Sequence, residues 1–269
     1  MISNAQEKYE ARARALNTML CVGLDPDFSK IPDRFENDEY PQLAFNKWVI
    51  DETHEYALAY KPNTAFYEAR GARGIEELRM TMEYVQTQHP DILTILDAKR
   101  GDIGNTNLGY CAFAFDYLKA DAITLHPYLG KEALQPFLDR EDKLSIILCR
   151  TSNSGSEEFQ DIKSEGKPLW EKVAENVAQK WNQKNNCMLV VGATYPQEMK
   201  RIREITGDMT FLVPGVGAQG GSVAGVLTNG LNSKAAGLII NSSRGIIFAE
   251  SPKEEARKLV EEIGNYIKS

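Results

Sequence analysis

A group of charged residues ends one of the short apolar runs in this sequence. The run that begins at Leu93 closes with Asp97 and Lys99, and Asp102 follows a turn that contains Gly101. Residues two positions apart on a strand point to the same side, so Asp97 and Lys99 are expected side by side. An opposite charge nearby favours the charged form of each group. We therefore predict a lysine that stays protonated beside an ionised carboxylate.

A second lysine ends the apolar run before this one. Lys61 closes that run and is followed by Pro62 and Asn63. Charged residues rarely close apolar strands unless they are paired or act chemically. Together with the later cluster, Lys61 gives two cations and two anions at the end of neighbouring strands. Two interpretations remain open at this point: an electrostatic catalytic array, or a salt-bridged network that only ties strand ends together.

Two later loops have the composition of a phosphate-binding site. Residues 215–221 include four glycines and precede a helical pattern. Glycines let backbone N–H groups approach an anion closely, and a helix N-terminus favours negative charge. Arg244 and Gly245 follow the last apolar run, and arginine suits bidentate phosphate binding. The two loops together predict a phosphate-ester ligand.

These residues must be positioned by a repeated pattern of strand and helix. Eight continuous apolar runs are expected as strands at residues 19–24, 58–61, 93–97, 122–125, 144–149, 188–191, 210–213 and 237–240. Amphipathic patterns predict helices at residues 42–56, 75–88, 106–119, 131–138, 169–183, 197–205, 221–231 and 253–267. This alternation predicts an α/β fold of the (β/α)₈ TIM-barrel type, in which phosphate is often bound after strands seven and eight. An open doubly wound sheet is the alternative, but no G-x-G-x-x-G follows the first run.

No domain boundary stands out, so residues 1–269 are expected to form a single barrel domain. The one long insertion, at about 151–168, is rich in Ser, Glu, Gly and Asn and lacks periodicity. After the fifth strand it would lie over the active-site face, which makes it a candidate lid. The alternative is a solvated surface loop.

Composition excludes several classes of protein. The chain has 31 basic and 38 acidic side chains, a net charge of −7 and no Lys/Arg run, which argues against nucleic-acid binding. No apolar run is long enough to span a membrane, and no secretory signal is visible. Four widely spaced cysteines predict buried reduced thiols and a cytoplasmic protein. Three histidines, none at ligand spacing, make a His-based metal site improbable. Cys149 is expected to be a buried thiol, and His126 a core-facing residue that caps a strand.

The stretch from Leu96 to Thr106 resembles the D-x-K-x-x-D-I-x-x-T signature of the orotidine 5′-monophosphate decarboxylase family. The resemblance covers nearly the whole chain, with further matches in family order at residues 23–25, 61–63, 214–220 and 244–245. It is greatest to the subgroup with Asp-Ala-Lys-Arg-Gly-Asp-Ile-Gly-Asn-Thr and a longer chain. The resemblance implies a homodimer of (β/α)₈ barrels that needs no cofactor and no metal. The implied reaction removes CO₂ from orotidine 5′-monophosphate (OMP) to give UMP, the last step of de novo pyrimidine synthesis.

The resemblance also implies a role for individual residues. Lys61, Asp97 and Lys99 would be catalytic, and Asp102 would complete the charged array from the partner subunit. Ile103 and Thr106 would also reach the partner's site. The substrate would be held through its ribose by Asp25 and Lys61, through its phosphate by Gln219, Arg244 and Gly245, and through its pyrimidine by Ser152. The segment around Ser152 matches the family only in part, because Ser154 stands where close relatives often have proline.

Three other functions remain as alternatives. Mg²⁺-dependent sugar-phosphate decarboxylases and hexulose-phosphate synthases share the D-x-K-x-x-D pattern but prefer a further acidic metal ligand, where this chain has Lys61. A Schiff-base aldolase would need a lysine with a lowered pKa, whereas Lys61 and Lys99 have expected acidic neighbours. A non-catalytic nucleotide-binding barrel would keep the phosphate loops but not the full set of two lysines and two aspartates.

Overall fold

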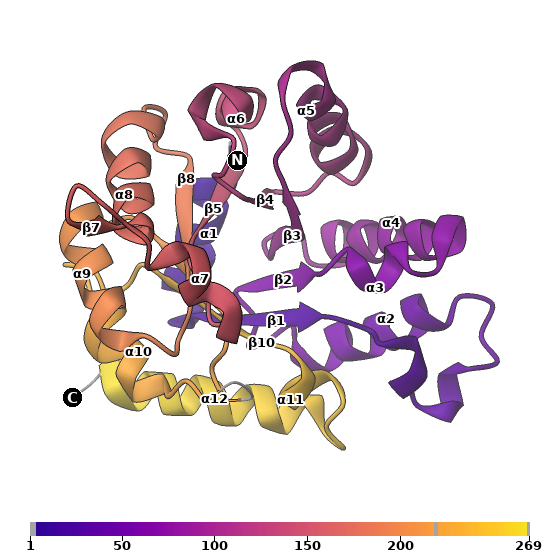
Figure 1. The fold of residues 1–269 in the computed structure, drawn as a ribbon. Helices are drawn as coiled ribbons and strands as arrows, with labels where there is room; N and C mark the ends of the chain where they lie inside the picture. The colour runs from indigo at the N-terminus through magenta and orange to yellow at the C-terminus, as the bar shows by residue number, and fades with distance from the viewer. Residues whose placement is uncertain (1–3, 218–219, 268–269) are drawn as a thin grey trace.

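Eight parallel strands close into a barrel in the computed structural model, which describes residues 4–217 and 220–267 (Figure 1). The barrel order is β1-β10-β9-β8-β5-β4-β3-β2. The strands are β1 (Leu20–Leu24), β2 (Ala59–Pro62), β3 (Leu93–Arg100), β4 (Ala122–Leu125), β5 (Leu144–Arg150), β8 (Cys187–Val191), β9 (Phe211–Val213) and β10 (Leu238–Ser242). Each coincides with a predicted run to within about three residues, so the predicted (β/α)₈ barrel is confirmed.

The strands are mostly apolar, apart from polar residues near their ends, because both of their faces are covered. Ile95 and Ile146 belong to a cluster that fills the barrel interior, whereas their neighbours Leu96 and Ile147 pack under the outer helices. Successive side chains on a strand point to opposite faces, so a run buried on both sides cannot alternate with polar residues. This explains why the strand pattern in the sequence is continuous.

The outer ring contains the predicted helices. They are α2 (Pro41–Thr53), α4 (Gly71–Gln88), α5 (Gly104–Cys111), α6 (Gly130–Leu138), α8 (Leu169–Asn176), α9 (Pro196–Thr206), α10 (Val223–Gly230) and α12 (Pro252–Ile267). Two of them continue as π-helical segments, α5 into η3 (Ala112–Tyr117) and α8 into η5 (Val177–Trp181). The helix expected at 221–231 begins instead at Val223, because the Ser222 side chain accepts the Gly225 N–H and caps it.

A further helix, α1 (Ala5–Leu16), covers the end of the barrel where the strands begin. Its residues Ala5 and Tyr9 join the interior cluster beside Leu58 and Leu144, which start or precede β2 and β5. The buried Arg12 side chain donates to the carbonyl of Ala57 at 2.7 Å. This cover leaves the opposite end, where the strands finish, as the open mouth of the barrel.

The segment after β5 has short ordered elements that its composition did not indicate. It contains η4 (Ser154–Ser156), α7 (Glu157–Gln160) and an antiparallel pair formed by β6 (Lys163–Ser164) and β7 (Lys167–Pro168). The remaining short helices are η1 (Phe28–Lys30), η2 (Asp33–Phe35), α3 (Ala65–Glu68) and α11 (Arg244–Ile247). None of the helices in the described ranges is long and apolar enough to cross a membrane.

The four cysteines, Cys21, Cys111, Cys149 and Cys187, are all buried and free, as predicted. The Cys149 thiol donates to the Trp170 carbonyl at 3.2 Å, and burial raises its pKa. His126 is only half-buried, with its ring packed against the backbone of Gly101. The expectation of a core-facing histidine therefore holds in part: it follows β4, but its ring lies at the barrel rim.

Candidate functional site

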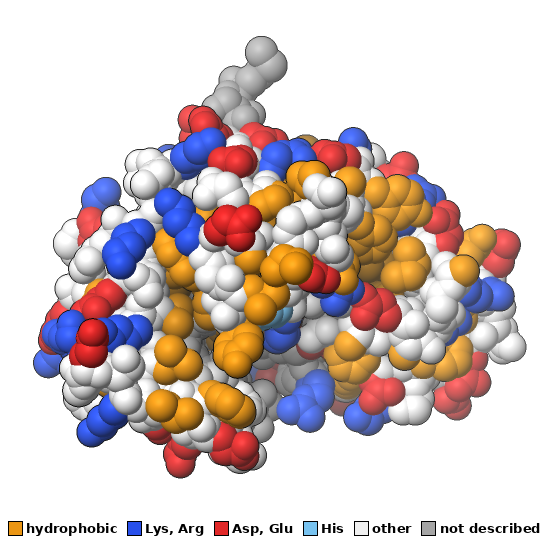
Figure 2. Space-filling view, turned by 45° about the horizontal axis from the view of Figure 1, so that its top comes forward, with side chains coloured by type: hydrophobic (Ala, Val, Ile, Leu, Met, Phe, Trp, Pro, Cys, Tyr) orange, Lys and Arg blue, Asp and Glu red, His pale blue; other side chains and the backbone are white. Residues whose placement is uncertain are grey.

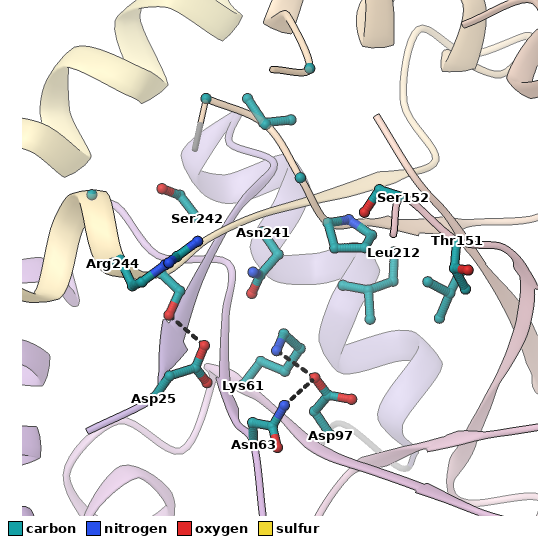
Figure 3. Close-up of a pocket in the computed structure, with 18 of the residues that line it drawn as sticks. Asp25, Lys61, Asn63, Asp97, Thr151, Ser152, Leu212, Asn241, Ser242 and Arg244 are labelled. Atoms are coloured by element: carbon teal, nitrogen blue, oxygen red, sulfur yellow. Dashed lines mark hydrogen bonds and ion pairs between the residues drawn. The ribbon is translucent and has the colours of Figure 1, made fainter. Parts of the chain in front are cut away.

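The open mouth of the barrel holds a cavity of about 1260 Å³. All eight barrel strands contribute lining residues, from the end of the strand or the loop that follows it. Figure 3 shows Arg244 on one side of the cavity and Thr151 and Ser152 on the other, with Lys61 and Asp97 between them in this view. A cleft at the carboxyl ends of barrel strands is the usual place for an active site.

The centre of the cavity holds a hydrogen-bonded group of charges. Asp97 accepts from the Lys61 ammonium at 2.8 Å and from the Lys99 ammonium at 2.6 Å. Asp97 also accepts from the Thr124 hydroxyl at 2.9 Å and from the Asn63 amide at 3.4 Å. Figure 3 shows the bonds to Lys61 and Asn63 as dashed lines. The structure thus brings together three of the four predicted catalytic residues.

Burial and neighbouring charges shift the pKa values of Asp97 and Lys61 in opposite directions. Burial would raise the pKa of Asp97, but the positive charges of Lys61 and Lys99 outweigh it and hold the pKa far below its usual range. Burial would lower the pKa of Lys61, but the charges of Asp97 and Asp25 raise it instead. Asp97 is therefore ionised and Lys61 protonated at neutral pH. The Lys99 side chain is 51% exposed and reaches into the open cavity.

The backbone at Lys99 is left-handed, with φ of 46°. A non-glycine residue in that region costs about 1–2 kcal/mol, and such strain often marks a functional site. The register of β3 against β4 shifts between Leu96 and Arg100, and the Thr124 hydroxyl accepts the Lys99 N–H at 2.9 Å. Asp97 and Lys99 do lie side by side as predicted, but at an irregularity in the strand rather than in a regular one.

The other residues of the signature lie outside this cavity. Asp102 does not line it; its carboxylate accepts the Ile103 N–H at 2.7 Å in the turn before α5. Ile103 is 62% exposed, and Thr106 is exposed on α5. Within one chain, therefore, the structure does not bring Asp102, Ile103 or Thr106 to the predicted catalytic residues.

Asp25 follows β1 and points into the cavity (Figure 3). Its Oδ2 accepts from the Ser243 hydroxyl at 2.5 Å, whereas its buried Oδ1 has no hydrogen-bond partner among the described residues. Sequence reasoning missed Ser243, as it missed Asn63 and Thr124. Only their position after strands or at strand ends could have pointed to them.

The predicted phosphate loops line the same cavity on the side of β9 and β10. Gly215, Gly217 and Gly220 have positive φ values of 93°, 73° and 87°, which glycine adopts without strain. A Cβ on Gly221 would lie 2.3 Å from the Ala193 Cβ, so the loop approaches the chain after β8 closely. Arg244 and Gly245 are exposed at the start of α11. Gln219 lies outside the described residues.

The Gly-rich loop is held partly by its own hydrogen bonds. The N–H of Gly217 donates to the Gly221 carbonyl at 2.9 Å, and that of Gly221 donates to the Gly215 carbonyl at 3.2 Å. These two amides are therefore engaged within the loop itself.

Ser152 lines the cavity at the end opposite Arg244 and packs against Gly192, where a Cβ would come within 2.9 Å of the Ser152 Cβ. The Arg150 side chain is 1% exposed and donates to the Ser156 hydroxyl and to the Gln160 amide oxygen of α7. The Arg150 guanidinium contacts Glu198 at 2.5 Å and Asp161 at 3.2 Å. Sequence reasoning did not single out this arginine.

Several negative expectations concern metals and nucleic acids. The described residues contain no group of three or more His, Cys, Asp or Glu side chains that could hold a metal ion. On the face in Figure 2, Lys and Arg side chains are interspersed with Asp and Glu, and no continuous basic stripe is visible there.

Comparison with known proteins gives a consistent result. A family model described as "Orotidine 5'-phosphate decarboxylase / HUMPS family" matches residues 18–259. Orotidine 5′-phosphate decarboxylase of Cellvibrio japonicus is 48% identical over 243 residues, which cover 90% of this chain and 88% of the relative. The enzyme of the same name from Flavobacterium johnsoniae is 46% identical over 259 residues, covering 94% of each chain.

Solved structures show the same similarity. Leishmania donovani OMP decarboxylase superposes with a TM-score of 0.89 at 38% identity, covering 99% of both chains. Leishmania donovani UMP synthase superposes with a TM-score of 0.91 at 41% identity, covering 98% of this chain and 56% of that one.

Proposed function

Because the chain belongs to the orotidine 5′-phosphate decarboxylase / HUMPS family, we propose that it removes CO₂ from OMP to give UMP, the last step of de novo pyrimidine synthesis. One observation carries this proposal. The ion pairs of Asp97 with Lys61 and Lys99 lie in the cavity that also contains both predicted phosphate loops. The stretch from Leu96 to Thr106 supports membership of the subgroup with the Asp-Ala-Lys-Arg-Gly-Asp-Ile-Gly-Asn-Thr motif.

Loss of CO₂ from C6 of the pyrimidine leaves a carbanion in the plane of the ring. No carbonyl is placed to delocalise those electrons as an enolate, so the charge must be stabilised electrostatically. The Lys99 ammonium suits this role, because it reaches into the cavity and contacts Asp97 at 2.6 Å. A fixed ammonium next to C6 stabilises the developing charge and then supplies the proton that completes UMP.

Asp97 has two roles open to it. As a second negative charge it would repel the substrate carboxylate by about 4 kcal/mol at ~4 Å and an effective dielectric constant of ~20, and that repulsion would end as CO₂ leaves. As an anchor it would orient Lys99. Both of its oxygens accept hydrogen bonds from cations, Oδ2 from Lys61 and Oδ1 from Lys99, which supports the anchoring role.

The remaining parts of the substrate would span the cavity. The phosphate would bind Arg244, Gly245 and Gln219, and the pyrimidine would face Ser152 on the opposite side. The ribose would lie between them on Asp25 and Lys61. Arg244 and Ser152 lie on opposite sides of the cavity in Figure 3, which suits a ligand as extended as a nucleotide. Phosphate binding far from C6 can be used to exclude water and raise the rate.

We propose a homodimer in which Asp102, Ile103 and Thr106 complete the partner's site. Their absence from the cavity of their own chain supports this arrangement, because the predicted array needs a fourth charge. Figure 2, which turns the side of α5 and α6 toward the viewer, shows apolar side chains among charged ones. Exposed apolar residues in this region include Leu108 on α5, Ile103 just before it, and Tyr128 and Leu129 just before α6.

The remaining proposals concern organisation and location. Residues 1–269 would form a single barrel domain, with residues 151–168 acting as a lid over the active-site face. Thr151 to Ser154 and Gln160 line the cavity, which supports this position for the segment. Four free, buried cysteines support a cytoplasmic location, where thiols stay reduced.

The test uses the purified protein treated with EDTA. We expect it to convert OMP to UMP, followed by ultraviolet absorbance, and adding Mg²⁺ should leave the rate unchanged. In parallel, the protein is given a hexulose phosphate with and without Mg²⁺, where no reaction is expected. Turnover of the sugar phosphate alone, dependent on Mg²⁺, would replace the proposal with the sugar-phosphate chemistry also covered by this family. Binding of UMP without any turnover would indicate a non-catalytic barrel.

A further inference from the structure

Ser243 links Asp25, the residue proposed to bind the ribose, to the turn that carries Arg244, the residue proposed to bind the phosphate. It follows β10, the last strand of the barrel, and its hydroxyl donates to Asp25 Oδ2 at 2.5 Å and contacts the Gly23 carbonyl at 3.1 Å. Asp25 lies 218 residues away in the chain, after β1. The bond therefore joins the end of the last barrel strand to the end of the first.

The bond uses one oxygen of the Asp25 carboxylate and leaves the other available. Asp25 Oδ1 is buried and has no hydrogen-bond partner in the described part of the chain, although Asp25 lines the cavity. A buried acceptor without a partner carries a free-energy cost, because its lost hydration is not replaced. A ligand that brings a hydroxyl donor to Oδ1 would remove that cost.

The backbone around Ser243 allows its side chain to approach Asp25 closely. A Cβ at residue 23 would lie 2.8 Å from the Ser243 Cβ and 2.9 Å from its Oγ, so only glycine at that position allows the approach. The Ser243 carbonyl accepts the N–H groups of Ile246 at 2.8 Å and Ile247 at 3.0 Å. The same residue thus closes the turn that carries Arg244.

We propose that Ser243 is a positioning residue: it fixes the Asp25 carboxylate so that Oδ1 accepts a ribose hydroxyl, and it ties this contact to the turn that holds the phosphate. The proposal rests on the proposed function, because it assigns Asp25 to the ribose. It makes Ser243 a determinant of the preference for ribonucleotides over nucleotides that lack ribose hydroxyls.

The physical basis is the freedom of a carboxylate to rotate. Without the Ser243 hydroxyl, neither oxygen of Asp25 is held by a hydrogen bond from the described residues. Hydrogen bonds to charged groups are stronger than those between neutral groups, and their strength depends on alignment. We therefore expect the selectivity for ribose hydroxyls to fall about tenfold or more when the hydroxyl is removed.

The experiment measures binding of UMP and 2′,3′-dideoxy-UMP by calorimetry to the wild type and to Ser243→Ala. The selectivity ratio is the affinity for UMP divided by the affinity for 2′,3′-dideoxy-UMP. We expect this ratio to be at least tenfold lower in Ser243→Ala than in the wild type, while the affinity for the dideoxy ligand stays within threefold of the wild-type value. Ser243→Gly, which also lacks the hydroxyl, serves if the first variant does not fold. The control is Ser233→Ala, which breaks a surface bond to Asp208 of 3.0 Å and should leave the ratio unchanged.

A double variant separates positioning from a general structural effect. Asp25→Ala should lower the ratio in the same way, and adding Ser243→Ala to it should lower the ratio no further. Equal loss of affinity for both ligands, an unchanged ratio, or additive effects in the double variant would each overturn the role of Ser243. If the wild type turns over OMP but Ser243→Ala has the wild-type selectivity ratio, only the role of Ser243 is refuted. A wild type that does not bind UMP refutes the proposed function as well.

Discussion

The ion pairs of Asp97 predict that its removal and the removal of Lys99 have very different effects on stability. The Lys61 side chain is 5% exposed and the Asp97 side chain 11% exposed, with 2.8 Å between the charged atoms. At that distance and an effective dielectric constant of ~20, the attraction is about 6 kcal/mol. In Asp97→Ala the buried Lys61 ammonium loses that partner. Breaking a buried pair by removing one member costs about 3–5 kcal/mol after relaxation.

Lys99→Ala should cost far less. The Lys99 side chain is 51% exposed, and pairs in contact with solvent contribute about 0–1 kcal/mol. Asp97 would still accept from Lys61, from Thr124 at 2.9 Å and from Asn63 at 3.4 Å. We therefore expect Lys99→Ala to be inactive but nearly as stable as the wild type.

The assay is urea-induced unfolding at one fixed protein concentration, because a dimer would make stability depend on concentration. Fluorescence of the buried Trp170 and Trp181 reports on the transition. Because the pKa of Asp97 is lowered in the folded state, its contribution to the free energy of unfolding depends on pH. That contribution is complete above about pH 4, near the unfolded pKa, and is lost as the pH falls toward the folded pKa. The difference in free energy of unfolding between the wild type and Asp97→Ala should therefore become smaller at acidic pH. Equal destabilisation by the two substitutions, or a loss below about 1 kcal/mol in Asp97→Ala, would refute the reasoning.

Three further predictions concern the phosphate, the dimer and the lid. Arg244→Ala should weaken UMP binding by about 10- to 150-fold, as expected for a charge-assisted bond, and leave uridine binding unchanged; equal affinity in calorimetry would contradict the phosphate role. Asp97→Ala and Asp102→Ala subunits, each nearly inactive, should regain partial activity when mixed; no recovery despite proven subunit exchange would place Asp102 in its own subunit's site. Arg150→Met should speed proteolysis within 151–168, where Arg150 now contacts Asp161 at 3.2 Å, while the control Arg201→Met should not; equal cleavage rates would refute that anchoring.

The barrel could be predicted from the sequence because its strands are buried on both faces. Apart from Ser145, the run 144–149 is apolar without alternation, and β5 indeed places Ile146 inside the barrel and Ile147 under the helices. The charged residues at strand ends indicated the site because they stand out from strands that are otherwise buried. Lys61 and Asp97 close apolar strands, and parallel strands bring such ends to one mouth.

Other features depend on contacts that no local pattern encodes. The bond between Ser243 and Asp25 joins residues 218 positions apart, so neither residue type nor spacing indicates it. The left-handed backbone of Lys99 arises where β3 shifts its register against β4. The order of the 151–161 segment comes from its contacts with the buried Arg150, although its own composition is that of a loop.

The most direct test of the central claim compares the wild type with Lys99→Ala in EDTA-treated buffer with OMP. The account predicts rapid conversion to UMP by the wild type. It predicts a loss of at least about a thousandfold in kcat for the variant, which should stay folded and still bind UMP. Retained turnover by a folded Lys99→Ala protein would contradict the assignment of this ammonium to charge stabilisation and proton donation at C6.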